Sequence, residues 1–448
     1  MPSVFFESLK KIVSYAVPIS VAQLVRILTP IVSTVMIAHL GILPLAASSL
    51  VGSYYLVSML FGFGMVFSVT IQASQHIGAK DYAAATRSVV NGIWLAGGIG
   101  LIALLLYILG PVILILFGQD PKIVALTPYY FYLLAISIAP YLVMFTLQQL
   151  LIAMGKPRLL FRLSILTTVV ALSTNYIFVF GVGRWHGIGL AGLGVGFLLS
   201  TIIVFIATLA CLVNSRERYP ILKNLLKVDI GGVKSLFHLG WPIGLNMVVE
   251  VGAMTVLVLM IGWINHFGLA AYPIIWQISI FYIMIPFGVR QSSTALVGQL
   301  LGAKEFKKVR ALSFTAIGLC VTIMLILAIL YVIFNHSIIG WFLRPNMDHE
   351  QLVAGIAYKM LYITAGYQIF DAVRIVSVGC LRGLRDVHVP LVLSFIGYWL
   401  IGIPVAALFG FGWGLGAVGM WLGLAASVVF CAVVIFVRLV KRLQVENC

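Results

Sequence analysis

Two acidic residues, Glu250 and Asp371, lie within long apolar segments of the sequence. A charged side chain at the centre of a bilayer costs about 2.5–3.5 kcal/mol on insertion scales, so it needs a partner or a function. Two carboxylates that share a dry pocket repel each other, and a bound Na⁺ or a proton relieves that repulsion. The two acids are therefore candidates for a site that binds a monovalent cation.

Four basic residues also fall within apolar segments: Arg26, Arg290, Lys359 and Arg374. Arg374 follows Asp371 by three residues and lies on the same face of a helix, so an Asp371–Arg374 ion pair is an alternative to the cation site. Glu250 has no basic residue one turn away in its own segment. Arg26 and Arg290 can either pair with an internal carboxylate or carbonyl, or contact an anionic or zwitterionic substrate.

The composition requires a membrane around these residues. Of the 448 residues, 62% are hydrophobic and 9% are charged, with a mean hydropathy of +1.13. A soluble domain carries roughly 25% charged residues, so this composition excludes a soluble globular protein. The net charge of +16 comes from short Lys/Arg clusters between apolar runs and not from a basic stripe, so we expect no nucleic-acid partner.

A membrane-spanning helix needs about 20 mainly apolar residues, and this criterion divides the chain into twelve segments. The predicted spans are 12–38, 44–77, 88–117, 123–154, 159–181, 188–213, 234–264, 269–300, 310–342, 351–381, 389–410 and 415–440. The sequence therefore predicts an all-α membrane protein with about twelve transmembrane helices, embedded in the lipid bilayer.

The distribution of Lys and Arg orients these spans. With the N-terminus inside, only three of the 28 basic residues lie in outer loops (Lys122, Arg184 and Arg344), four lie within spans, and the remaining 21 lie inside. This bias predicts a multi-pass protein of the plasma (bacterial inner) membrane with both termini cytoplasmic. The longest polar stretch, 214–233, is the predicted cytoplasmic linker between an N-terminal lobe, 1–213, and a C-terminal lobe, 234–448.

The two lobes repeat each other at an offset of 224 residues. Pro18-Ile19 matches Pro242-Ile243, and the loop sequence Gly78-Ala79-Lys80 recurs as Gly302-Ala303-Lys304. Six spans per lobe is an even number, so both lobes enter the membrane in the same sense and form parallel repeats. Transporters with such repeats bind substrate near the middle of the membrane, between the repeats.

Five motifs resemble those of the multidrug and toxic compound extrusion (MATE) transporters, and the resemblance covers essentially the whole chain. They are STVMIAHLG at 33–41, QHIGAKDYAAATR at 75–87, NYIFVFG at 175–181, VGQLLGAKEFKKVR at 297–310 and FDAVRIVSVGCLRGLRD at 370–386. The resemblance implies two six-helix lobes around a central cavity. It also implies antiport: export of small organic, drug-like compounds by alternating access, driven by entry of Na⁺ or H⁺.

The chain further resembles the subgroup in which acids of the second lobe bind the coupling cation. Glu250 and Asp371 match those positions, and Tyr367 lies one turn from Asp371. The resemblance thus implies a cation site at Glu250, Asp371 and Tyr367, with Na⁺ as the only metal. In the first lobe Ser33 stands where the family usually carries an Asp, so we expect no titrating acid there.

The candidate substrate-binding residues combine charged and polar side chains. They are Arg26, Asn175, Gln277, Tyr282, Arg290 and Arg374. Arg26 and Arg374 stand where this subgroup often has Gln, and Asn175, Gln277 and Tyr282 could equally form hydrogen bonds between packed helices.

Two other classes of function are alternatives: a flippase, and a membrane enzyme or channel. A flippase for a lipid-linked or anionic substrate shares the architecture; Arg26 and Arg290 favour it, whereas twelve spans count against it. An enzyme would need a nucleophile, a base and an electrophile at one face, and the sequence shows no such set. We therefore expect a monomeric transporter that is not an enzyme and that needs no cofactor beyond its coupling ion.

Overall fold

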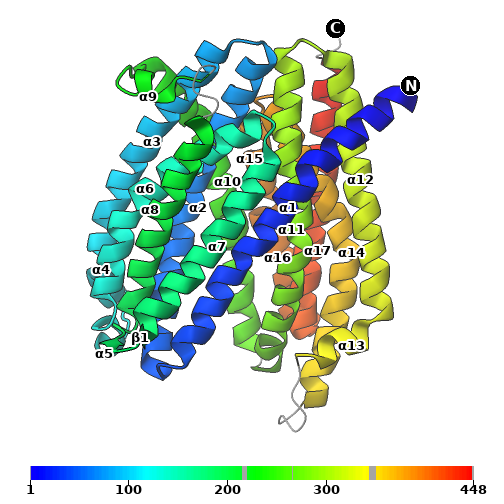
Figure 1. Ribbon diagram of the computed structural model, residues 1–448. Coiled ribbons are helices and arrows are strands. Elements are labelled where there is room, and N and C mark those ends of the chain that lie inside the picture. Colours follow the sequence, from blue (N-terminus) through cyan, green and yellow to red (C-terminus); the bar gives the residue numbers. More distant parts are fainter. Residues whose placement is uncertain (1, 214–218, 265, 343–349, 446–448) are drawn as a thin grey trace. The chain divides into compact units, whose positions relative to one another are not determined.

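The computed structural model describes residues 2–213, 219–264, 266–342 and 350–445, and these are almost entirely helical (Figure 1). The helices of the first half are α1 (Pro2–Ala38), α2 (Ile42–Gly78), α3 (Tyr82–Ile108), α4 (Gly110–Leu116), α5 (Pro121–Val124), α6 (Pro128–Ala153), α7 (Pro157–Phe180), α8 (Ala191–Val213) and α9 (Ile221–Asn224). Those of the second half are α10 (Ile230–Ile264), α11 (His266–Gly302), α12 (Phe306–Ile333), α13 (Asn335–Gly340), α14 (Glu350–Gly383), α15 (His388–Phe395), the π-helix η1 (Ile396–Gly402), α16 (Ile403–Ala407), the π-helix η2 (Leu408–Gly412) and α17 (Gly416–Val445).

Eleven helices of the described residues are long and apolar enough to cross a membrane, and the segments α15 to η2 count as one of them, His388–Gly412. The remaining long helix is α14, which covers the predicted span 351–381. It falls outside the eleven because polar residues, among them Lys359, Asp371 and Arg374, interrupt its apolar run. The prediction of an all-α membrane protein with about twelve spans is confirmed.

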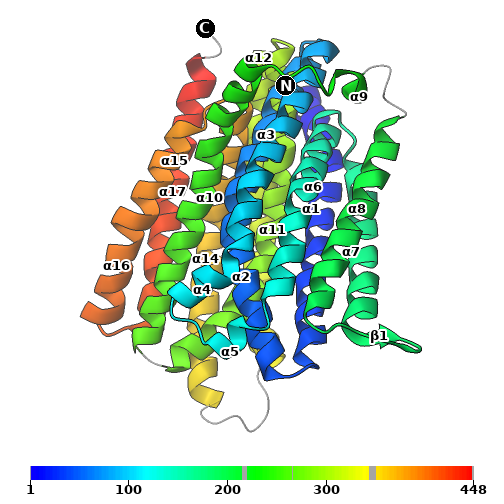
Figure 2. The ribbon, with the colours of Figure 1, turned by 90° about the vertical axis from the view of Figure 1, so that its left-hand side faces the viewer.

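Two predicted spans extend too far. The span 88–117 breaks after Ile108, because Pro111 has no backbone N–H to continue the helix; it lies instead in the first turn of the short helix α4. The span 310–342 ends at Ile333 and is followed by α13. After α7, a two-stranded antiparallel hairpin joins β1 (Gly181–Val182) to β2 (Trp185–His186), and Figure 2 shows it beyond the end of α7.

The chain forms two compact units, which are Val21–Gly244 and the combination of Met1–Ser20 with Leu245–Cys448. Each of the helices α1 and α10 therefore begins in one unit and ends in the other. The two boundaries lie at residues 20 and 244, which are 224 residues apart, the offset of the sequence repeat. The lobes 1–213 and 234–448 remain a prediction, and the predicted linker begins with 214–218, outside the described residues.

Close backbone contacts within each unit repeat at the same offset. In the unit Val21–Gly244, a Cβ atom at Gly64 of α2 would collide with the backbone of Gly244 in α10. In the other unit, a Cβ atom at Gly288 of α11 would collide with Ser20 of α1. Small residues let helix backbones approach this closely in membranes. The first segment of each repeat thus packs on the second helix of the other repeat.

The repeated Gly-Ala-Lys loop also has one structure in both places. Lys80 has a φ of 61° and Lys304 a φ of 59°, so both adopt the left-handed conformation in which helices commonly end. Lys80 N donates to Ile77 O at 3.0 Å, and Lys304 N donates to Leu301 O at 3.0 Å. The sequence repeat is therefore a structural repeat at this turn.

Candidate functional site

The candidate cation site lies in the unit that contains Leu245–Cys448. Helix α10 supplies Glu250, and α14, which packs on α11, α12 and α17, supplies Asp371 and Arg374. The side chains of Asp371 and Arg374 are only 4% and 5% exposed, whereas that of Glu250 is 21% exposed. Both acids therefore lie largely away from solvent within helices that are long enough to span a membrane.

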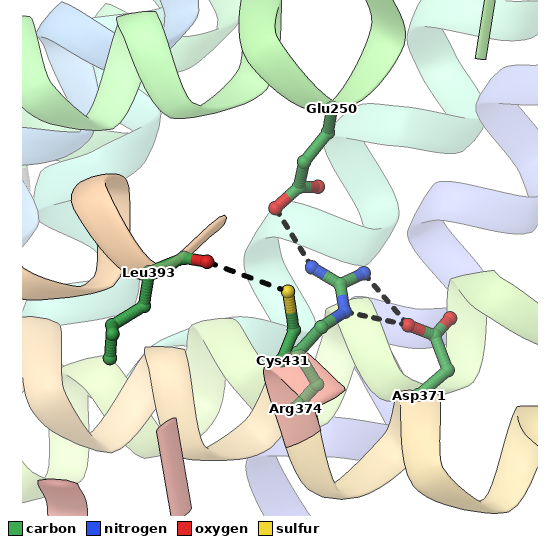
Figure 3. Close-up of polar contacts among 5 residues, drawn as sticks. All are labelled: Glu250, Asp371, Arg374, Leu393 and Cys431. Atoms are coloured by element: carbon green, nitrogen blue, oxygen red, sulfur yellow. Dashed lines mark hydrogen bonds and ion pairs between the residues drawn. The ribbon is translucent and has the colours of Figure 1, made fainter. Parts of the chain in front are cut away.

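The guanidinium group of Arg374 lies between the two carboxylates (Figure 3). Its Nε and Nη2 atoms donate to Asp371 Oδ1 at 2.8 and 2.7 Å, and its Nη1 atom donates to Glu250 Oε1 at 2.8 Å. We call these three residues the charged triad. The Asp371–Arg374 ion pair, the predicted alternative to a cation site, is therefore present. Arg374 also bonds Glu250, which lies on another helix.

The charged triad has unused capacity to bind a cation. Two carboxylates and one guanidinium leave one net negative charge. Within the part of the chain that the structure describes, neither Glu250 Oε2 nor Asp371 Oδ2 makes a hydrogen bond. Because a buried charge is costly unless it is balanced, one Na⁺ ion or one proton on these oxygens would neutralise the triad.

The π-helix η1 packs against the charged triad. Arg374 lies over the ring of Tyr398, with 5.6 Å from the guanidinium carbon to the ring centre. Trp399 Nε1 donates at 3.1 Å to the carbonyl of Val249, the residue before Glu250. Short π-helical insertions often occur at functional sites. Here the insertion brings Tyr398 to Arg374 of α14, and it brings Trp399 to the backbone of α10 next to Glu250.

The predicted third member of the cation site, Tyr367, is buried on α14 and does not contact Arg374 among the described contacts. Its hydroxyl interacts with that of Tyr282 on α11, and both rings lie in electrostatic range of Asp371. The ring of Trp421 packs edge-on against Tyr367 at 6.4 Å. Tyr282, predicted to contact substrate, is therefore a buried neighbour of Tyr367.

The other predicted substrate residues of this unit are placed differently. Arg290 on α11 stacks over Phe287 at 4.2 Å and lies in electrostatic range of both acids of the charged triad, but forms no ion pair with them. Gln277, also on α11, is exposed. The structure thus brings Arg290 near the triad and leaves Gln277 at the surface of its unit.

A close helix crossing holds α14, the helix that carries Arg374, against α11. A Cβ atom added at Gly379 of α14 would lie 2.6 Å from the backbone oxygen of Arg290, nearer than real Cβ atoms approach. Thr294 Oγ1 adds a hydrogen bond across the same crossing, donated to the Gly379 carbonyl at 2.9 Å. The contact of α11 with α14 therefore depends on glycine at this position.

We expect Gly379→Ala to destabilise the protein by about 1–3 kcal/mol, because α11 and α14 would have to move apart. The control is Gly366→Ala on the same helix, where an added Cβ atom has no neighbour within 4 Å. Thermal unfolding of the purified proteins measures both effects. Equal unfolding temperatures for the two variants would show that the crossing tolerates a methyl group.

The unit Val21–Gly244 contains Arg26 and Asn175. Arg26 Nη2 of α1 donates to Gln148 Oε1 of α6 at 2.7 Å, and Asn175 Nδ2 of α7 donates to Ser33 Oγ at 2.9 Å. The hydroxyl of Ser33 thus bonds an amide at the position where the family usually carries an Asp. Gln148, which the sequence did not mark, is the direct partner of Arg26. No local spacing could reveal it, because the two residues are 122 positions apart.

Comparison with known protein families gives a match over most of the chain. The MatE family model matches residues 18–177 and 242–408, one segment in each half. A probable multidrug resistance protein NorM of Pseudomonas putida is 31% identical over 95% of this chain and 92% of its own length. A protein of the same description from Pseudomonas aeruginosa is 31% identical over 97% of this chain and 89% of its own length.

Solved structures share the fold at low sequence identity. The Vibrio cholerae MATE transporter VcmN in its bent form has a TM-score of 0.90 and 20% identity, with 99% of each chain covered. A transporter of the MOP superfamily from Pyrococcus furiosus has a TM-score of 0.89 and 18% identity, with 98% of this chain and 97% of the other covered. These likenesses show that the fold is that of the solved transporters.

Proposed function

Because this chain belongs to the MatE family of transporters, we propose that it is a secondary active exporter of organic, drug-like compounds that works by antiport against Na⁺ or H⁺. It is a multi-pass membrane protein and not an enzyme. Its bacterial relatives are described as probable multidrug resistance proteins, which supports the substrate class and an inner-membrane location. The Lys/Arg bias supports cytoplasmic termini, and nothing in the described fold requires a second copy.

The charged triad is the observation that carries the coupling part of the proposal. It holds one net negative charge within membrane-spanning helices, and the free oxygens of Glu250 and Asp371 can accept one Na⁺ ion or one proton. Binding and release of that cation would change the charge of the site by one unit. An ion gradient can therefore do work on the conformation of the helices that form it.

Alternating access requires helices that can bend as the two units move. Helices α1 and α10 each run from one unit into the other, and Pro18 and Pro242 lie two residues before the two unit boundaries. A proline within a helix removes one backbone hydrogen bond and weakens the helix locally. The repeat therefore places a bendable point in each helix that connects the units.

The flippase alternative rests on Arg26 and Arg290, the arginines of α1 and α11, since a lipid-linked pyrophosphate or another anion would need them. The relatives named as multidrug resistance proteins cover nearly the whole chain and favour the exporter. In an exporter, these arginines would help to select the compounds that are exported.

Transport by the purified protein in proteoliposomes tests the proposal. Ethidium and carboxyfluorescein serve as cationic and anionic probe solutes, and a Na⁺ gradient or a pH gradient is imposed separately. We expect one of the two gradients, directed opposite to solute movement, to accelerate transport of at least one probe. Transport that responds to neither gradient would exclude antiport.

A further inference from the structure

We propose that Arg26 and Gln148 form a binding site for the anionic group, a carboxylate or a sulfonate, of an exported organic compound. The proposal deepens the proposed function and rests on it, because it names the substrate class of that exporter. The site lies entirely within the unit Val21–Gly244.

The Arg26–Gln148 pair has hydrogen-bond donors to spare. Arg26 is half-buried, and Gln148 is 1% exposed. A guanidinium carries five N–H groups, and the described residues use one of those of Arg26, in its bond to Gln148 Oε1. Because Arg26 can only donate, the amide of Gln148 must present its oxygen to it. The amide nitrogen of Gln148 is then directed elsewhere, and its two N–H groups have no partner in the described structure.

The charge of Arg26 is the second feature that indicates an anion. Three of the four acids of this unit lie at helix ends (Asp81, Asp120 and Asp229), and the fourth, Glu217, is outside the described residues. Arg26 makes no ion pair within the described part of the chain. A guanidinium within a membrane-spanning helix, paired only with a neutral amide, is not balanced by this unit. An anion would balance it.

The two repeats also carry opposite charges at matched positions. Arg26 on α1 and Glu250 on α10 are 224 residues apart, so they occupy matched positions. Each reaches a partner on the fourth long helix of its repeat: Gln148 on α6 for Arg26, and Arg374 on α14 for Glu250. The second repeat carries two acids around one arginine. The first carries an arginine and an unpartnered amide donor. One repeat therefore suits a cation, and the other suits an anion.

The aromatic side chains around Arg26 add to this chemistry. Tyr141 lies in electrostatic range of Arg26, and its hydroxyl bonds that of Tyr55. Among the described residues of this unit, a cation would meet a guanidinium and N–H donors here and no carboxylate to receive it. The geometry therefore disfavours cations at this position and favours an aromatic or alkyl compound with an acidic group, whose anion accepts from Arg26 and from Gln148 Nε2.

The test measures binding without any gradient, so that it is independent of coupling. Carboxyfluorescein is titrated against the purified protein in uncharged nanodiscs, with fluorescence anisotropy as the readout and ethidium as the cationic probe. We expect Arg26→Gln to weaken carboxyfluorescein binding about tenfold or more, since a charge-assisted hydrogen bond is lost. The matched control is Arg162→Gln, which removes one exposed arginine of α7 in the same unit.

A second variant keeps the test valid if Arg26→Gln fails to fold. Gln148→Glu gives Arg26 an internal carboxylate, so the protein should be at least as heat-stable while carboxyfluorescein binding falls by a similar factor and ethidium binding does not. Unchanged carboxyfluorescein affinity in either folded variant would overturn the proposal, as would a wild-type protein that binds only ethidium. These outcomes are separate from those of the gradient experiment, in which antiport can fail while the binding site stands.

Discussion

Replacing Glu250 with Gln is expected to abolish gradient-driven transport while the protein remains folded. In this variant Asp371 and Arg374 keep their two contacts at 2.8 and 2.7 Å and form a neutral ion pair. The net negative charge of the triad disappears, so no cation is required at the site. Transport should fall to the rate measured without a gradient, because an ion that no longer binds cannot bias the two conformations.

Asp371→Asn should also abolish gradient-driven transport, because it leaves Arg374 in a neutral pair with Glu250 at 2.8 Å. The double variant differs. If the acids simply shared one ion, it would be no worse than either single variant. Because Arg374 lies between them, the double variant leaves a buried guanidinium without any acid, and removing the partners of a buried charge costs about 3–5 kcal/mol. We therefore expect each single variant to fold and the double variant to be markedly less stable.

Proteoliposome transport under a Na⁺ or pH gradient, together with thermal unfolding, measures these effects. Glu305→Gln is the matched control, because Glu305 belongs to the same unit but forms an exposed pair with Lys308 outside the triad. Its transport and ion dependence should equal those of the unaltered protein. Fully gradient-driven transport by Glu250→Gln would place the coupling site elsewhere.

The spans could be predicted because each depends on local composition. A run of about 20 apolar residues must be helical in lipid, so the helices and most of their ends follow from the sequence. The error at Ile108 arises where apolar residues continue past the end of a helix, so hydropathy cannot mark the break. After Ile333 the sequence turns polar at Asn335, His336 and Ser337, and the predicted span passed over that signal.

A count of spans could not reveal that α1 and α10 each begin in one unit and end in the other. The sequence shows matched residues at the offset of 224, but it does not show on which repeat the beginning of α1 packs. That depends on the close contact of Ser20 with Gly288, between residues far apart in the chain. Only the small size of both side chains hinted at such an approach.

In the candidate site, too, one contact follows from local spacing in the sequence and another joins residues far apart in the chain. The Asp371–Arg374 pair could be predicted from a spacing of three residues on one helix. The bond between Arg374 and Glu250 joins residues 124 positions apart, and no pattern in the sequence indicates it. The sequence thus identifies the charged residues that need partners, and the positions of α10 and α14 in the fold decide which partners they have.

Replacing Arg374 with Gln should have the largest effect on stability, and it should make stability depend on cations. Without the guanidinium, Glu250 and Asp371 face each other as two carboxylates with limited exposure. Removing one partner of a buried ion pair costs about 3–5 kcal/mol, and here it leaves two like charges. The variant should therefore unfold at a much lower temperature than the unaltered protein in Na⁺-free buffer at alkaline pH.

Na⁺ should then take the place of the guanidinium. A ligand that binds only the folded state stabilises it by about 2.7 kcal/mol at a concentration one hundred times its dissociation constant, so added NaCl should raise the unfolding temperature of Arg374→Gln. Choline chloride at the same ionic strength should not. Lower pH should also restore stability, because protonation of one carboxyl removes the repulsion. Arg310→Gln, which removes an exposed arginine of α12, should show neither dependence.

Two further variants separate repulsion between the acids from loss of packing. Arg374→Gln combined with Asp371→Asn leaves a single carboxylate at the site, so it should recover much of the lost stability without Na⁺. Arg374→Lys keeps the charge but lacks the planar fork that bonds both acids at once, so its stability should lie between those of the unaltered protein and Arg374→Gln. If Arg374→Gln is as stable as the unaltered protein in Na⁺-free alkaline buffer, the two acids do not need the guanidinium between them. The charged triad could then not be the place where cation binding is coupled to the fold.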